Sequence, residues 1–182
     1  MKKLTLLIAL ALCITVGGVY AAWSYAESTA VASSTIAPQV KLTATNNTTK
    51  GTITFEGTPT VAIDQADDNH NAKLDWSNPV VTVKFTPAAG TTATKINVDI
   101  TVVLPTNTFT TSAGDYLVFK HADGDAQTFT VRVNDVDANG QTFDLSEHIT
   151  TQLRLPTLAD YNAFQLAMSG YPISISAAEA TN

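Results

Sequence analysis

The sequence predicts an all-β protein: an antiparallel β-sandwich, jelly-roll-like in its connectivity, with one short helix near residues 157–169. Threonine makes up about one residue in six, and threonine, valine and isoleucine favour strands because branched side chains suit a pleated surface. Apolar and polar residues alternate over several short stretches between turn residues, as in half-buried strands. About nine strands at this spacing favour a sandwich, although spacing does not establish their order.

Alternation predicts the strands of the first half. The clearest stretch is 96–104, where five apolar residues in phase predict a central, half-buried strand. Residues 64–78 are rich in aspartate and asparagine and are expected to form a polar loop. Further strands are expected around residues 40–44, 53–55, 61–63 and 81–85.

Turn residues divide the second half. Residues 105–115 are expected to form a loop, and Asp123-Gly124 is expected to join strands 116–120 and 129–133 as a hairpin. Residues 141–145 are expected to pair again beyond Asn139-Gly140. The last strand is expected over 171–176, with a frayed tail from Ala177.

One segment has the signature of a helix. Thr157 precedes it and Asp160 follows three residues later, which is the spacing of a capping box. Its apolar residues recur at helical spacing and Gly170 ends it. This apolar stripe consists of Leu158, Tyr161, Phe164 and Met168.

The N-terminus has the pattern of a secretory signal peptide. Lys2 and Lys3 precede an apolar run over residues 4–16, which is shorter than the roughly 20 residues of a transmembrane helix. We therefore expect export and an extracellular or cell-surface location. The expected organisation is a signal peptide over 1–22, an N-terminal segment over 23–37 and a β-sandwich domain over 38–182.

Charge and cysteine content exclude several classes of protein. The net charge is −6, and loss of Lys2 and Lys3 with the signal peptide would make it −8. Such a balance argues against nucleic-acid binding and against anionic membrane surfaces. The single cysteine, Cys13, lies within the expected signal peptide. The chain after it therefore has no disulfide and depends on its core, on metal ions or on partner subunits.

Residues 17–24 carry a resemblance to a known family. Gly17, Gly18, Tyr20, Ala21, Ala22, Trp23 and Ser24 resemble the cleavage region of signal peptides cut by the SipW-type signal peptidase. Such signal peptides are found in the TasA/camelysin family of biofilm-matrix fibre proteins, to which archaeal bundling pilus subunits are similar. The resemblance implies cleavage after Ala22. Val19 and Ala21, or Ser24 and Ala26, would also serve an ordinary signal peptidase.

The resemblance implies a non-enzymatic subunit of an extracellular filament that polymerises head to tail with copies of itself. The segment freed by cleavage would complete a sheet of the next subunit, and membrane contact would end with cleavage. The expected donor-strand residues are Trp23, Tyr25, Val31 and Ile36. A flexible tail is the alternative for this segment. The alternative functions are a secreted, monomeric calcium-binding module and a camelysin-like metallopeptidase.

An acidic stretch is the best candidate for a metal site. Oxygen ligands at alternate positions followed by a glycine, as in Asp-x-Asp-x-Asn-Gly, resemble the start of a calcium loop. The stretch departs from that pattern because Ser146 stands at position twelve and no flanking helices are evident. A solvated Asn-Gly hairpin turn is the alternative. The candidate ligands are Asp135, Asp137, Asn139, Gln141, Asp144 and Glu147.

Signatures of catalysis are missing from the sequence. His70, His121 and His148 are scattered, and the His-Glu-x-x-His and Gly-x-Ser-x-Gly patterns do not occur. Surface histidines in loops are the simplest interpretation, although three distant histidines can converge in a fold.

Overall fold

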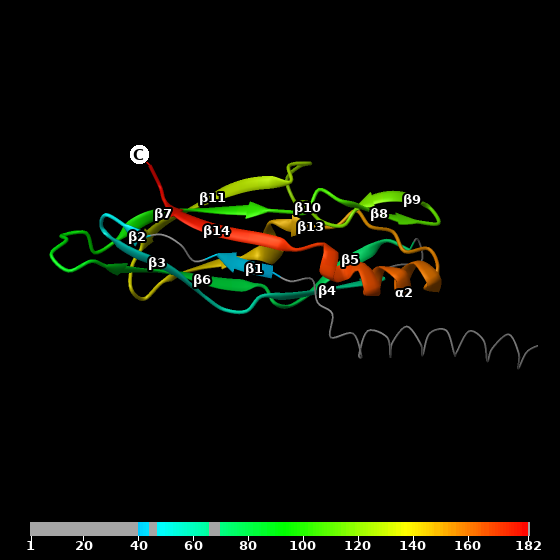
Figure 1. Ribbon diagram of the computed structural model, residues 1–182, viewed down its shortest axis with the longest axis horizontal. Helices are drawn as coiled ribbons and strands as arrows, with labels where there is room; N and C mark the ends of the chain where they lie inside the picture. The colour runs from blue at the N-terminus through cyan, green and yellow to red at the C-terminus, as the bar shows by residue number, and fades with distance from the viewer. Residues whose placement is uncertain (1–39, 44–46, 66–69, 182) are drawn as a thin grey trace, which may run out of the picture. The chain divides into compact units, whose positions relative to one another are not determined.

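A computed structural model describes residues 40–43, 47–65 and 70–181 (Figure 1). These residues belong to a compact unit over 36–182. Strands dominate it, so the all-β prediction is confirmed. Sheet A contains β1 (Val40–Thr43), β7 (Ile96–Val103), β11 (Thr128–Val136) and β14 (Ile173–Glu179). Sheet B contains β2 (Asn47–Thr48), β3 (Gly51–Glu56), β6 (Val80–Pro87) and β12 (Gln141–Asp144).

The two sheets form a sandwich-like arrangement, drawn as two layers in Figure 1. The strand order is β1-β14-β7-β11 in sheet A and β12-β6-β3-β2 in sheet B. Neighbouring strands are antiparallel except β1 and β14, which are parallel. This order does not confirm a jelly-roll connectivity, which stays a prediction.

The core lies between the inner faces of the two sheets. Every second residue of β7 is buried, as the alternation predicts, and the same holds for β6. Burying one such aliphatic or aromatic side chain contributes roughly 1.5–3 kcal/mol. The buried residues of these two central strands are Ile96, Val98, Ile100, Val102, Val81, Val83 and Phe85.

Three further strand pairs lie outside the two main sheets. They are β4 (Thr60–Gln65) with β5 (Ala72–Asn78), β8 (Thr108–Thr111) with β9 (Gly114–Leu117), and β10 (Lys120–His121) with β13 (Ile149–Thr150). The loops predicted over 64–78 and 105–115 are therefore wrong in part. Leu74 and Trp76 alternate with exposed Lys73 and Asp75 in β5, a strand pattern that the many polar residues of this region conceal.

The hairpin predicted at Asp123-Gly124 is also wrong. β10 pairs with β13, and β11 pairs with β7 instead of returning along residues 116–120. β12 likewise pairs with β6 of the other sheet and not with β11. Turn residues show where a chain reverses, but the partner of each strand is decided by where its apolar face is buried.

The predicted helix is confirmed. It comprises α2 (Leu158–Ala167), followed by a 3-10 turn, η2 (Met168–Gly170). Thr157 and Asp160 form the reciprocal capping box, and Asp160 also accepts hydrogen bonds from the backbone N–H and hydroxyl of Ser112. Partial desolvation acts to raise the pKa of Asp160, but the hydrogen bonds from Thr157 and Ser112 outweigh it and lower that pKa.

The last strand extends beyond its predicted end. β14 continues to Glu179, and Ala177 is only 3% exposed. The expected fraying from Ala177 is therefore wrong, because residues 174–179 pair with β7.

Candidate functional site

The candidate calcium residues lie along one connection between the sheets. Asp135 is in β11 at an irregularity of its pairing with β7, where its φ is +56° and its N–H donates to Asn97 Oδ1 (3.1 Å). Asp137 and Asn139 lie in the turn that follows. Gln141 and Asp144 are the two ends of β12, and Glu147 is in the 3-10 turn η1 (Leu145–Glu147).

Two of these carboxylates already bind backbone N–H groups. Asp137 Oδ1 accepts from the N–H of Asn139 (2.8 Å) and from that of Gly140 (3.3 Å), which fixes the turn. Asp144 Oδ1 accepts from the N–H (2.9 Å) and hydroxyl (2.6 Å) of Ser146, and so caps η1. Both carboxylates thus have a structural role in the fold.

The strand β12 divides the candidate ligands into two groups. An extended strand rises about 3.4 Å per residue, so Asp144 lies roughly 10 Å beyond Gln141. Within the described part of the chain, no three histidine, cysteine, aspartate or glutamate side chains form a group that could hold a metal ion. Calcium binding stays a prediction, and Asp135 in β11 and Asp137 and Asn139 in the turn that follows form the group of candidate ligands that precedes β12.

Two of the three histidines come together, which the sequence analysis did not foresee. The rings of His148 and His121 stack with centroids 6.4 Å apart, and Phe143 stacks on His148 at 4.9 Å. Phe129 packs on His121 at 4.1 Å. The prediction of surface histidines in loops is therefore incomplete, since the His121 side chain is only 17% exposed. This stack of rings connects β11, an edge strand of sheet A, with β12, an edge strand of sheet B.

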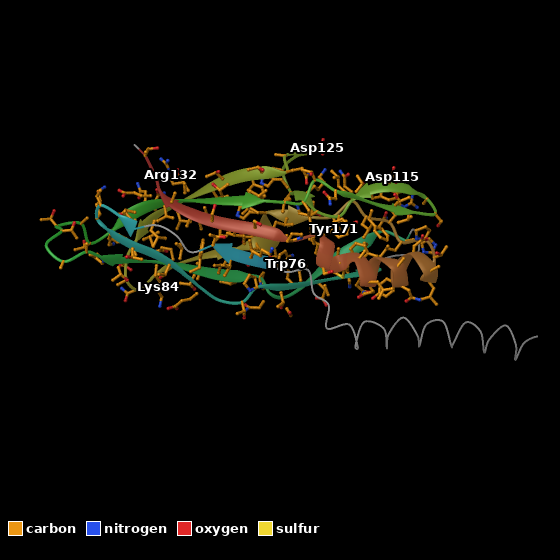
Figure 2. All side chains as sticks on the ribbon, in the orientation of Figure 1. Trp76, Lys84, Asp115, Asp125, Arg132 and Tyr171 are labelled. Carbon is orange, nitrogen blue, oxygen red and sulfur yellow. The ribbon has the colours of Figure 1, made fainter. Side chains whose placement is uncertain are left out.

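The predicted donor-strand residues, Trp23, Tyr25, Val31 and Ile36, lie outside the described residues. The structure instead describes the sheet edges to which a strand could be added. Among the described residues, β1 and β11 end sheet A, while β12 and the two-residue β2 end sheet B. The outer face of β11 carries Arg132 (Figure 2), which donates two hydrogen bonds to Asp99 and lowers the pKa of that carboxyl.

In the described part of the chain, the second edge of β3 is paired over only part of its length. β2 pairs with Gly51 and Thr52 and goes no further, whereas β6 pairs with all of β3 from Gly51 to Glu56. Residues 53–56 of β3 therefore have a described strand partner on one side only. Sequence reasoning missed this feature because alternation locates a strand but does not show which of its two edges is paired.

Comparisons with known proteins found no match among protein-family models, curated proteins or solved structures. Of the helices in the described ranges, none has the length and apolar character needed to cross a membrane. The fold defines the chain as an all-β, sandwich-like protein, and in its described part the two main sheets end at β1, β11, β12 and β2.

Proposed function

We propose that this protein is a structural subunit of an extracellular filament or pilus of a biofilm matrix. Each copy would donate its N-terminal segment, residues 23–37, to a sheet of the next copy. Two features support the proposal: the cleavage-site resemblance at residues 17–24 and a sandwich-like body that follows the segment. The resemblance to TasA/camelysin-type proteins implies the same function.

The observation that carries the proposal is the set of open sheet edges in the described part of the body. An unpaired edge presents N–H and C=O groups that an extended peptide from another chain can satisfy. When the donor and the acceptor are different surfaces of one molecule, the contact is head to tail and propagates into a fibre. In the proposal, residues 23–37 are the donor and a sheet edge of the next copy is the acceptor.

The acidic stretch Asp135–Asn139 would then have a supporting role. Calcium bound there would neutralise part of the negative charge of each subunit and so reduce repulsion between copies. Neither a catalytic role nor a nucleic-acid partner is proposed, since the histidine pair is packed among phenylalanine rings and the chain is acidic.

Deletion of residues 23–36 tests the proposal. The exported protein is expected to form filaments and the deleted protein to stay monomeric while keeping its thermal unfolding midpoint. Filaments of the deleted protein would contradict the proposal.

A matched pair of point variants sharpens this test. Val31→Ser and Ala32→Ser lie on opposite sides of an extended segment, and both keep the length of the chain. Val31→Ser is expected to weaken assembly more than Ala32→Ser. Equal effects of the two variants would argue against a strand with one apolar side.

A further inference from the structure

We infer that a hollow on sheet A is the anchor site for Trp23 and Tyr25 of a second copy of this chain. The hollow has a volume of about 360 Å³ and lies where β7 ends and β14 begins. The inference rests on the proposed function and deepens it, because it names the surface that receives the tip of the donated segment. The residues that line the hollow include Val103, Pro105, Thr106, Asn107, Pro172 and Ser174.

Two neighbouring side chains show which way the hollow faces. Val103 is 43% exposed, although Val102 before it is buried. Ser174 lies opposite Val103 in the pairing of β14 with β7, and it stands between two buried isoleucines. Successive side chains of a strand point to opposite faces of the sheet, so Val103 and Ser174 both point outward. The hollow therefore lies on the outer face of sheet A, away from the core.

The lining of the hollow suits an aromatic side chain. Its volume falls within the roughly 300–1,000 Å³ of clefts that hold small organic molecules. None of the described residues that line it is charged, and Val103, Pro105 and Pro172 offer apolar surface. A buried tryptophan or tyrosine also needs a hydrogen-bond partner for its N–H or O–H. The Thr106 hydroxyl and the Asn107 amide line the same hollow and supply such partners.

The N-terminal segment carries the matching side chains at its tip. Trp23 and Tyr25 are two residues apart, so they lie on the same side of an extended chain. Glu27 is the only charged side chain over residues 23–36, and the α-ammonium group created by cleavage belongs to the backbone and stays in water at the rim. Tryptophan and tyrosine are also enriched among the residues that anchor protein interfaces in pockets.

The length of the segment favours a second copy over the segment's own body. Val40 lies opposite Ile173, so the segment joins its own body directly beside the hollow. Residues 23–39 reach roughly 56 Å when extended, which carries the tip away from that hollow. β7 has 8 residues and is therefore about 27 Å long. An extended segment can thus run the length of β7 in the next copy and still have about half its length to connect the two bodies.

Other features of the described surface are less suited to the tip. A second hollow lies at the opposite end of β7, but its lining includes Lys50, Lys95, Asp135 and Glu179. An aromatic ring placed there would remove water from these charged groups, which is costly. Leu166 on α2 is 78% exposed, but it lines neither hollow.

Photochemical cross-linking of the exported, processed protein tests the inference. A photoreactive benzophenone side chain replaces Tyr25, which keeps an aromatic ring at this position. Filaments are assembled from a mixture of isotope-labelled and unlabelled copies, and the cross-linked peptides are identified by mass spectrometry. Cross-links are expected between labelled and unlabelled chains, at residues 103–107 or 170–174. The control has the same probe at Ser24, which points to the other side of an extended chain, and is expected to reach the hollow much less often.

The outcomes of this experiment are distinct. Filaments whose cross-links from position 25 lie elsewhere would overturn the inference alone. Cross-links confined to single chains would also overturn it, because the segment would then occupy its own hollow. Absence of filaments from the unmodified protein would overturn the proposed function.

Two matched substitutions provide a second readout. Val103→Arg places a charge and a long side chain in the hollow, and Leu166→Arg makes the same change at an exposed site outside it. Val103→Arg is expected to raise the critical concentration for assembly by at least about 10-fold, whereas Leu166→Arg is expected to leave it unchanged. Thermal unfolding midpoints of the two variants show whether both remain folded. Equal critical concentrations for the two folded variants would contradict the inference.

Discussion

Thr43 lies opposite Ser176 in parallel register at the outer edge of sheet A. Four positions later, Asn47 lies opposite Thr52 in sheet B. The chain therefore changes sheets between these two pairs, and the strand that begins to cover β3 is only two residues long. Among the described residues, β2 therefore pairs with only Gly51 and Thr52 of β3.

The first prediction concerns Gly51, at the start of β3, which lies opposite Pro87 of β6 in sheet B. A Cβ at this position would lie 2.3 Å from the Thr86 carbonyl oxygen and 2.6 Å from the Phe85 ring. Because the closest contact is backbone, Gly51→Ala is expected to lower the free energy of unfolding by about 2–3 kcal/mol. Denaturant unfolding measures this change.

Gly124→Ala is the matched control for that substitution. No atom lies within 4 Å of a Cβ built at Gly124, so the expected change is within about 0.5 kcal/mol. If both variants were equally stable, the close approach of Gly51 to Thr86 and Phe85 of β6 would be contradicted.

The second prediction concerns the bond between α2 and the β8–β9 hairpin. Asp160 accepts from the Ser112 N–H (2.9 Å) and hydroxyl (2.7 Å), and it also completes the capping box with Thr157. Asp160→Ala removes all of these bonds and is expected to cost about 2 kcal/mol. Ser112→Ala removes only the hydroxyl bond and is expected to cost less than about 1 kcal/mol. Equal unfolding free energies for the two variants would show that the shared carboxylate is unimportant.

The third prediction is a pH dependence. The folded state lowers the pKa of Asp160, so the carboxylate stabilises the fold at pH values above its ordinary pKa of about 3.9. This contribution is lost as the pH falls through the lower, folded-state pKa. Below about pH 4 the unmodified protein is therefore expected to lose stability more steeply than Asp160→Asn. Unfolding midpoints measured between pH 6 and about pH 2 give the slope of stability against pH for each protein. Parallel slopes for the unmodified protein and Asp160→Asn would count against the hydrogen bonds to the Asp160 carboxylate.

The fourth prediction concerns calcium. Calcium ligands are expected to come from Asp135, in β11, and from Asp137, in the turn that follows. Asp144 is excluded from this group because it lies at the far end of β12. Calcium is expected to raise the thermal midpoint of the unmodified protein and of Glu147→Gln, but not that of a variant with Asp135→Asn and Asp137→Asn. A calcium shift that persists in the double variant would place the site elsewhere, and no shift in any variant would exclude calcium stabilisation.

Local pattern predicted much of the secondary structure. Alternation located β3, β6, β7 and β11 because each has one face in the core, and the Thr157–Asp160 spacing located α2. Strand pairing was not predictable in the same way. Lys120 and His121 pair with Thr150 and Ile149, roughly thirty residues away along the chain, and no local residue pattern encodes a contact at that separation.

The candidate site was predictable only in part. The acidic residues of the 135–147 stretch are visible in the sequence, but Asp144 is separated from Gln141 because Phe143 is buried and β12 is extended. The stacking of His121 with His148 depends on the β10–β13 pairing, so it appears only once the fold is known. The change of sheet between Thr43 and Asn47 has the same origin, because it too depends on pairing with distant strands.

The central claim is that copies of this chain join head to tail through the N-terminal segment. Electron microscopy of the exported, processed protein with calcium added, at increasing protein concentration, tests it most directly. We expect unbranched filaments for the intact protein and only single particles for the protein lacking residues 23–36. An intact protein that remains monomeric at every concentration, with or without calcium, would contradict the account.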